Sequence, residues 1–132
     1  MRLCVALAAA ALFSLATAVP AAADSPSAQP VPDRALFLTV SGSENTWIRG
    51  VALPCPPTSD TRHPHAAAAC AALAEAAGDL DGLPGDPHPC TQEFDPVTAT
   101  ATGTWDGRRV AWRKTFSNAC VMDAVTGPVF RF

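Results

Sequence analysis

The stretch Cys90-Thr91-Gln92-Glu93-Phe94-Asp95-Pro96 could present a peptide bond to the catalytic nucleophile of another protein. Asp-Pro favours a turn at its end, and a strand-like run over residues 97–105 follows directly. Residues that exclude a helix or a central strand precede it, namely Pro84, Gly85, Pro87 and Pro89. Proteases bind substrates as extended segments. Because Cys90 can tie this segment to the body of the protein, we predict an exposed loop that serves as bait for a protease.

The N-terminus has the features of a secretory signal peptide. Arg2 precedes an apolar run over residues 3–18, and two small-residue cleavage signatures end at Ala18 and Ala23. We predict cleavage after Ala23, which removes residues 1–23, and secretion to the extracellular space. An uncleaved membrane anchor is the alternative, but no other segment is long and apolar enough to span a bilayer. Residues 24–34 are expected to be a flexible mature N-terminus, followed by one domain over residues 35–132.

Five cysteines become four once Cys4 leaves with the signal peptide. An even number of cysteines in a secreted chain indicates disulfides. Cys55, Cys70, Cys90 and Cys120 allow three pairings, which the spacing leaves open. Removal of Arg2 leaves eight basic and twelve acidic residues, a net charge of about −4 (8 − 12). A mildly acidic chain without a basic cluster is a poor candidate for binding nucleic acid.

The order of apolar runs predicts an α+β domain. Residues 35–40, 47–53, 97–105, 109–116 and 129–132 have strand character, and Asp106-Gly107 is a hairpin turn signal. The alanine-rich run 65–77 predicts a helix that carries Cys70, and a short helix carries Cys120. We therefore expect about five antiparallel strands and two short helices. One face of the third strand carries threonines that could form a dimer surface, namely Thr98, Thr100, Thr102 and Thr104.

Other residues that could bind a metal or act in catalysis are expected to have ordinary structural roles. His63 and His65 lie near Cys70, but a cysteine in an oxidising compartment is expected to be bridged, so we predict no metal site and no cofactor. His63, His65 and His88 all lie in proline-rich loops, and no nucleophile motif such as Gly-x-Ser-x-Gly is present. We therefore predict that the chain is not an enzyme.

From about residue 35 to residue 132, the chain resembles the Streptomyces subtilisin inhibitor family. The resemblance rests on the four-cysteine spacing and on several short runs in a fixed order. These runs are Arg34-Ala35-Leu36-Phe37-Leu38-Thr39-Val40, Gly78-Asp79-Leu80, Phe94-Asp95-Pro96-Val97, Gly103-Thr104-Trp105-Asp106-Gly107-Arg108-Arg109-Val110, Phe116-Ser117-Asn118-Ala119-Cys120 and Val129-Phe130-Arg131-Phe132. Each run is weakly specific, whereas their combination is specific.

The resemblance implies a secreted homodimeric inhibitor of extracellular subtilisin-like serine proteases. It implies a five-stranded antiparallel sheet with two helices, and the disulfides Cys55–Cys70 and Cys90–Cys120. The reactive bond would lie between Gln92 and Glu93. The flanking loop residues would be Pro89, Cys90 and Thr91 before the bond, and Phe94, Asp95 and Pro96 after it.

Three departures from the usual family pattern bear on function. Gln92 replaces the more usual Met, Lys or Arg, Glu93 replaces a small apolar residue, and the stretch between Cys70 and Cys90 is about one residue short. Gln92 disfavours trypsin-like targets, because their buried acid would lose its cationic partner. Glu93 could weaken binding, since a charge in a desolvated cleft is costly. Asn118, which precedes Cys120 by two residues, could support the loop backbone or simply cap the second helix.

Three alternatives remain at this point. The chain could be a secreted interaction protein that keeps the inhibitor scaffold with weak potency. It could instead inhibit a metalloprotease. A glutamate-selective protease could also read Glu93, rather than Gln92, in its primary specificity pocket.

Overall fold

A single antiparallel sheet forms the framework of the domain. The structure is a computed structural model that describes residues 32–132 and the isolated positions 21, 23, 25 and 30. The strands are β1 (Arg34–Gly42), β2 (Ile48–Pro54), β3 (Val97–Trp105) and β4 (Arg108–Phe116). They lie in the order β2-β1-β3-β4, so that β1 and β3 are central. Apart from positions 21 and 23, the predicted signal peptide lies outside the described residues.

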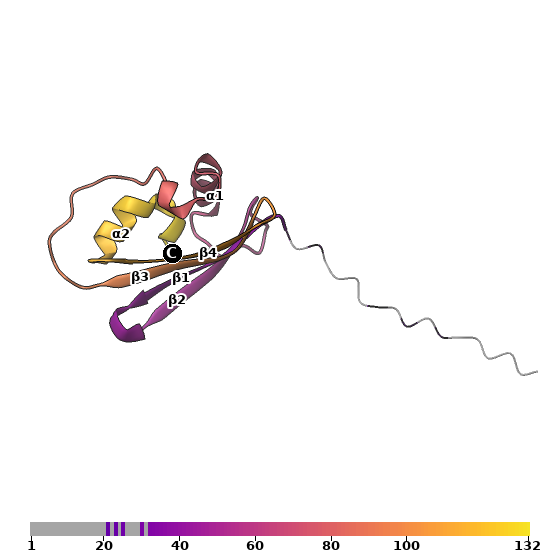
Figure 1. Ribbon diagram of the computed structural model, residues 1–132, viewed down its shortest axis with the longest axis horizontal. Coiled ribbons are helices and arrows are strands. Elements are labelled where there is room, and N and C mark those ends of the chain that lie inside the picture. The colour runs from indigo at the N-terminus through magenta and orange to yellow at the C-terminus, as the bar shows by residue number, and fades with distance from the viewer. Residues whose placement is uncertain (1–20, 22, 24, 26–29, 31) are drawn as a thin grey trace, which may run out of the picture.

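Two helices cover one face of this sheet (Figure 1). These are α1 (Ala66–Glu75) and α2 (Ala119–Thr126), and the short 3-10 segments η1 (Ser43–Asn45) and η2 (Leu80–Gly82) complete the connections. The period of two in the central strands aims small and branched apolar side chains at the helices. The core residues that these strands contribute are Leu36, Leu38, Val40, Val97, Ala99 and Ala101.

The opposite face of the sheet carries the predicted row of threonines. Thr39 on β1 and Thr100 on β3 are in hydrogen-bond contact through their hydroxyls. Thr98 and Thr115 form a further hydroxyl pair at 2.8 Å between β3 and β4. Phe37 is half exposed on this face. Because α1 and α2 both lie on the other side, no helix of residues 32–132 covers the threonine face.

The predicted fifth strand at residues 129–132 is wrong. The chain forms the 3-10 helix η3 (Gly127–Phe130) there, with Pro128 in its first turn. A half-buried strand would alternate, but Val129 and Phe130 are consecutive and both buried. The Val129 carbonyl accepts a hydrogen bond from His63 Nε2 at 2.9 Å, and the Phe130 ring stacks on Trp112. The carbonyl therefore pairs with a side chain of the core instead of a neighbouring strand.

Helix α1 is joined to the sheet by the disulfide Cys55–Cys70. The predicted helix 65–77 is two residues shorter at its C-terminal end, because residues 76–78 form the turn that closes it. In that turn the Gly78 amide donates to the Leu73 carbonyl at 2.8 Å. Within the described part of the chain, no helix has the length and apolar character needed to cross a bilayer.

Candidate functional site

The longest connection between two elements of the domain runs from the end of η2 to the start of β3. Residues 83–96 have no regular secondary structure. In Figure 1 this connection arches around α2 before it enters β3. The predicted bait stretch forms its second half. Thr91, Gln92, Glu93 and Asp95 are exposed, and Phe94 is 79% exposed, so the side chains on both sides of the Gln92–Glu93 bond face solvent.

The first anchor of this loop is covalent. Cys90 forms a disulfide with Cys120 in the first turn of α2. The second disulfide, Cys55–Cys70, completes the pairing that the family resemblance implies. His88 Nδ1 lies 3.8 Å from the Cys90 sulfur and 3.7 Å from the Cys120 sulfur. This histidine and the two sulfurs are close enough to resemble a metal site, but both sulfurs are bonded to each other and are not thiolates.

The second anchor is the side chain of Asn118. Its Nδ2 donates to the Glu93 carbonyl at 2.8 Å and to the Thr91 carbonyl at 3.3 Å. Its Oδ1 accepts from the Val121 amide at 2.9 Å, which is the N-cap contact of α2. The side chain therefore makes both of the contacts considered for Asn118. The side chain is buried between the helix and the loop, and these hydrogen bonds hold it there.

The end of the loop has anchors that the sequence did not indicate. The Asp95 amide donates to the Ser117 carbonyl at 3.0 Å. The Ser43 hydroxyl donates to the Pro96 carbonyl at 3.3 Å, which connects the loop to the turn between β1 and β2. Backbone carbonyls and a serine in a distant turn leave no signal in the sequence. With these contacts the loop is fixed on both sides of an exposed centre.

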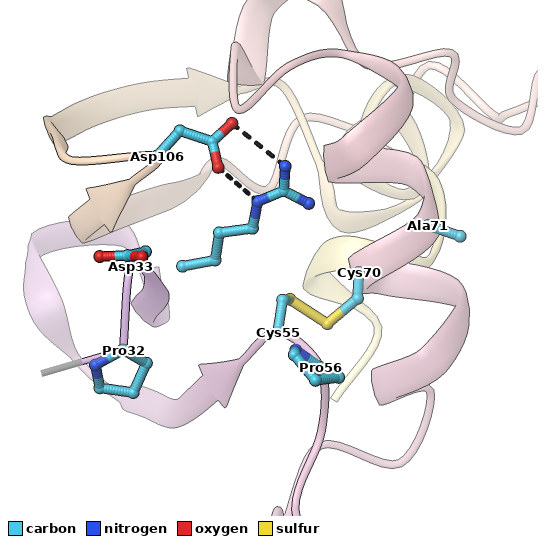
Figure 2. Close-up of a pocket in the computed structure, with 8 residues that line it drawn as sticks. Pro32, Asp33, Cys55, Pro56, Cys70, Ala71 and Asp106 are labelled. Carbon is cyan, nitrogen blue, oxygen red and sulfur yellow. Dashed lines mark hydrogen bonds and ion pairs between the residues drawn. A yellow bond between two sulfur atoms is a disulfide. The ribbon is translucent and has the colours of Figure 1, made fainter. Parts of the chain in front are cut away.

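A second candidate is an open hollow of about 650 Å³ beside the start of β1 and the turn after β3 (Figure 2). Arg34 pairs there with Asp106, with nitrogen–oxygen distances of 2.6 and 3.1 Å. The Cys55–Cys70 disulfide forms part of its wall. Its charged pair connects β1 to the β3–β4 turn, so this hollow belongs to the framework, and we take the loop as the candidate site.

The histidines considered as metal ligands are used differently. His63 is buried, and its Nδ1 accepts from the His65 amide at 3.0 Å while Nε2 contacts the Val129 carbonyl. Burial lowers the pKa of His63, which favours the neutral ring that these contacts require. Cys70 is bonded to Cys55. His63 therefore links the segment before α1 to η3, and Cys70 ties α1 to the end of β2, while the His65 side chain is exposed.

Comparison with known proteins places these features in one family. Residues 32–118 match the family model described as subtilisin inhibitor-like. The chain is 44% identical over 134 residues to a subtilase-type protease inhibitor from Streptomyces coelicolor, which covers 98% of this chain and 88% of that protein. It is 43% identical over 103 residues to subtilisin inhibitor-like protein 7 from Streptomyces ambofaciens, covering 74% and 94%.

A solved structure gives the same result. The crystal structure of Streptomyces caespitosus sermetstatin in complex with Bacillus licheniformis subtilisin matches with a TM-score of 0.56 and 40% identity. The match covers 74% of this chain and 96% of sermetstatin. This chain therefore has the fold of sermetstatin, a protein solved in complex with subtilisin, and carries its long loop on that fold. The chain belongs to the subtilisin inhibitor-like family.

Proposed function

We propose that this chain is a secreted inhibitor of subtilisin-like serine endopeptidases, with Gln92–Glu93 as the bond presented to the protease. The observation that carries this proposal is the placement of Asn118. It binds the carbonyls of Thr91 and Glu93, which flank the Gln92 carbonyl on either side. Among the described residues, nothing hydrogen-bonds the Gln92 carbonyl itself. That carbonyl is therefore free to enter the oxyanion hole of a protease, which must bind the oxygen during attack.

Inhibition follows from holding both ends of the loop. The catalytic serine attacks the Gln92 carbonyl carbon, the Gln92–Glu93 bond breaks, and the proton carried by the catalytic histidine goes to the new Glu93 amine. The Cys90–Cys120 disulfide holds the acyl side, while Asn118 and the contacts of Asp95 hold the amine side. The amine stays at high effective concentration beside the acyl-enzyme, so resynthesis of the bond competes with hydrolysis.

Preorganisation supplies the affinity. A flexible peptide loses conformational entropy when it becomes extended in a protease cleft. Residues 89–96 are already fixed by the Cys90–Cys120 disulfide, by Asn118 and by the Asp95 amide, so less entropy is lost on docking. The loop can then add its backbone to the enzyme as a strand.

The same contacts argue against attack after Glu93. In that alternative the attacked carbonyl would be that of Glu93, which accepts the 2.8 Å hydrogen bond from Asn118. Its oxygen would have to leave Asn118 to enter the oxyanion hole. This geometry favours the Gln92–Glu93 bond over the glutamate-selective alternative.

The side chains at the bond set the expected targets. Gln92 is exposed, neutral and long, so it suits the wide primary pocket of a subtilisin and gives trypsin no cation for its buried acid. Glu93 is exposed on the leaving side, and its charge would be desolvated in the cleft. This carboxylate is the observation that favours the second candidate function, a secreted interaction protein of weak inhibitory potency.

The relatives support the inhibitor class. The matched proteins are named as protease inhibitors, and sermetstatin was solved with subtilisin. Membership of an inhibitor family bears out the prediction that the chain is not an enzyme. Secretion, with cleavage after Ala23, remains part of the proposal and is supported by the composition of residues 1–23.

The threonine face supports the homodimer as a further part of this proposal. Thr39 and Thr100 meet at its centre, with Arg113 of β4 opposite Thr100, and Phe37 is 51% exposed on the same face. A second copy of the chain would bury this ring. Sedimentation equilibrium should give twice the mass of one chain, and Phe37→Glu should give monomers. Monomers of the unaltered protein would contradict this part.

The proposed function is tested by titrating subtilisin and trypsin with the purified mature protein. We expect stoichiometric loss of subtilisin activity and little effect on trypsin. Rapid cleavage without inhibition would instead support the interaction protein of weak potency. Inhibition of a secreted metalloprotease without inhibition of subtilisin would overturn the choice of target class.

A further inference from the structure

A cluster of charged groups lies beneath the approach to the reactive loop. Arg131, in the C-terminal segment, donates from Nε to Asp123 Oδ1 at 2.7 Å and from Nη2 to Asp123 Oδ2 at 2.9 Å. The same Nη2 contacts Asp86 Oδ2 at 3.1 Å. His88 Nε2 lies 2.8 Å from Asp123 Oδ2. Asp123 on α2 therefore joins the C-terminal segment to the residues that lead into the loop.

The backbone is close to α2 at the same place. The Asp86 amide donates to the Ala124 carbonyl at 3.0 Å. A Cβ on Gly85 would lie 2.6 Å from that carbonyl oxygen, so only glycine allows this approach. Helix α2 thus contacts the connection at several successive points, from Ala124 and Asp123 through Cys120 to Asn118.

We propose that the cluster centred on Asp123 is a proton-dependent brace, in which His88 and Arg131 position the loop on the acyl side of the Gln92–Glu93 bond. This inference rests on the proposed function. His88 is two residues from Cys90, so a change in its contact with Asp123 acts next to the disulfide that holds the acyl side. His88 and Arg131 do not touch the reacting atoms; they act through the loop backbone.

The charges around His88 determine the direction of the pH dependence. The hydrogen bond to Asp123 raises the pKa of His88, and the Pro89 carbonyl and the charge of Asp86 raise it further. The hydrogen bond from Arg131 and the contact with His88 lower the pKa of Asp123. The neighbouring Cys90–Cys120 sulfurs are bonded and do not titrate.

The brace is therefore complete only within a pH window. His88 has a raised pKa in the folded protein, so its contribution is fully present below the ordinary histidine pKa of about 6.5 and is lost as the pH rises through the folded value. Asp123 has a lowered pKa, so its contribution is present above the ordinary aspartate pKa of about 4 and is lost as the pH falls through the folded value. The loop should be held most firmly from roughly pH 4 to 6.5.

The size of the effect is limited by solvent. The side chains of His88, Asp123 and Arg131 are each about one third exposed, with relative areas of 34%, 30% and 37%. Partly exposed ion pairs change an equilibrium by a few-fold. We therefore expect a modest pH-dependent change in how well the loop is held and not a loss of the fold.

The first test compares His88→Gln with His65→Gln. His65 is exposed and lies before α1, away from the loop, so it is a matched control for the same substitution. The rate of cleavage by subtilisin between Gln92 and Glu93 is measured at pH 6 and pH 9. The rate of each variant is divided by the rate of the unaltered protein at the same pH, which removes the pH dependence of the protease. We expect His88→Gln to be cleaved about two- to fivefold faster at pH 6 and equally fast at pH 9. An equal ratio at both pH values, or the same effect of His65→Gln, would overturn the brace.

The second test needs no protease. The ring of His88 is titrated by NMR in the unaltered protein and in Asp123→Asn, and protection of the Asp86 amide against hydrogen exchange is measured at pH 6 and pH 9. We expect the pKa of His88 to fall in Asp123→Asn, and amide protection in the unaltered protein to decrease at pH 9. An unchanged His88 titration would overturn the brace whatever subtilisin does. An intact brace in a protein that does not inhibit subtilisin would overturn the proposed function and, with it, the positioning role.

Discussion

The two disulfides of this chain close loops of very different character. Cys55–Cys70 spans 15 residues, lies at the edge of the core and joins β2 to α1. Its loop contains the buried His63, which binds the Val129 carbonyl. Cys90–Cys120 spans 30 residues and joins α2 to an exposed connection without regular structure.

Chain entropy gives the two bonds similar weight. In the loop-closure model each contributes roughly 3–4 kcal/mol to the free energy of unfolding. The surroundings make the difference, because one bond is packed against the core while the other holds backbone that has almost no packing of its own. One kind of covalent bond therefore serves the stability of the domain in one place and the preorganisation of a binding loop in another.

Replacement of both cysteines of a pair by serine should separate these two roles most strongly. Cys90→Ser with Cys120→Ser should be cleaved between Gln92 and Glu93 about a hundredfold faster, because the acyl side is no longer held near the leaving amine. The matched control is Cys55→Ser with Cys70→Ser. Its free energy of unfolding should fall by roughly 3 kcal/mol, as in the first variant, but it should still inhibit subtilisin at a temperature where it is folded. Cleavage by subtilisin and chemical denaturation provide the two readouts. Equal susceptibility of the two folded variants to cleavage would refute the distinction.

Asn118 offers the next largest effect, and two substitutions divide its roles. Asn118→Ser keeps an oxygen that can cap α2 but cannot donate to both loop carbonyls, whereas Asn118→Ala loses the cap as well. Both variants should be cleaved about tenfold faster, since each loses hydrogen bonds from Asn118 to the loop carbonyls. A hydrogen bond between uncharged groups contributes about 1 kcal/mol. In thermal unfolding, Asn118→Ala should be less stable than Asn118→Ser by about 1 kcal/mol. If both Asn118 variants were cleaved as slowly as the unaltered protein, Asn118 would be a helix cap only.

Glu93 tests whether the exposed loop still functions as bait. Glu93→Val removes a charge that the protease cleft must desolvate, so the inhibition constant for subtilisin should fall about tenfold, equivalent to about 1.4 kcal/mol. Glu75→Val, at an exposed position on α1, makes the same change in net charge and should leave binding unaltered. Weaker binding of Glu93→Val would show that this residue does not enter the cleft as proposed.

The smallest expected effect concerns the entry to the loop. Gly85→Ala would place a Cβ 2.6 Å from the Ala124 carbonyl oxygen at a backbone φ of +68°, so the approach must shift away from α2. Gly107→Ala is the control, since its φ is +76° but its Cβ would meet nothing within 4 Å. Both should lose about 1 kcal/mol in thermal unfolding from backbone strain, and only Gly85→Ala should be cleaved a few-fold faster. Equal cleavage of the two would mean that the approach does not position the loop.

Local patterns in the sequence were sufficient to predict much of the sheet and the loop. The alternation in β3, the Asp106-Gly107 turn and the alanine-rich helix α1 all formed, since each depends on neighbouring residues. The strand expected at residues 129–132 did not form, because apolar character in four residues cannot distinguish a strand from η3 packed beneath a helix.

The contacts that hold the loop were mostly beyond local patterns. His88 and Asp123 are 35 residues apart, and Asp86 and Arg131 are 45 apart, so their meeting depends on how α2 and the C-terminal segment pack. The Asp95 amide pairs with a backbone carbonyl, and such a contact leaves no trace in residue type. Among the non-covalent contacts only that of Asn118 could be suspected, because Asn118 lies two residues before Cys120, which anchors the loop.

Inhibition by this loop requires that the anchors keep the two new ends together after the Gln92–Glu93 bond is cleaved. The most direct measurement starts from purified cleaved protein, adds a catalytic amount of subtilisin, and follows the intact mass over time. We predict that the bond is resynthesised, and that the mixture reaches the same ratio of intact to cleaved protein as when it starts from intact protein, with a ratio of about one. Cleaved protein that stays cleaved, while intact protein is converted completely, would show that the anchors do not hold the two ends together.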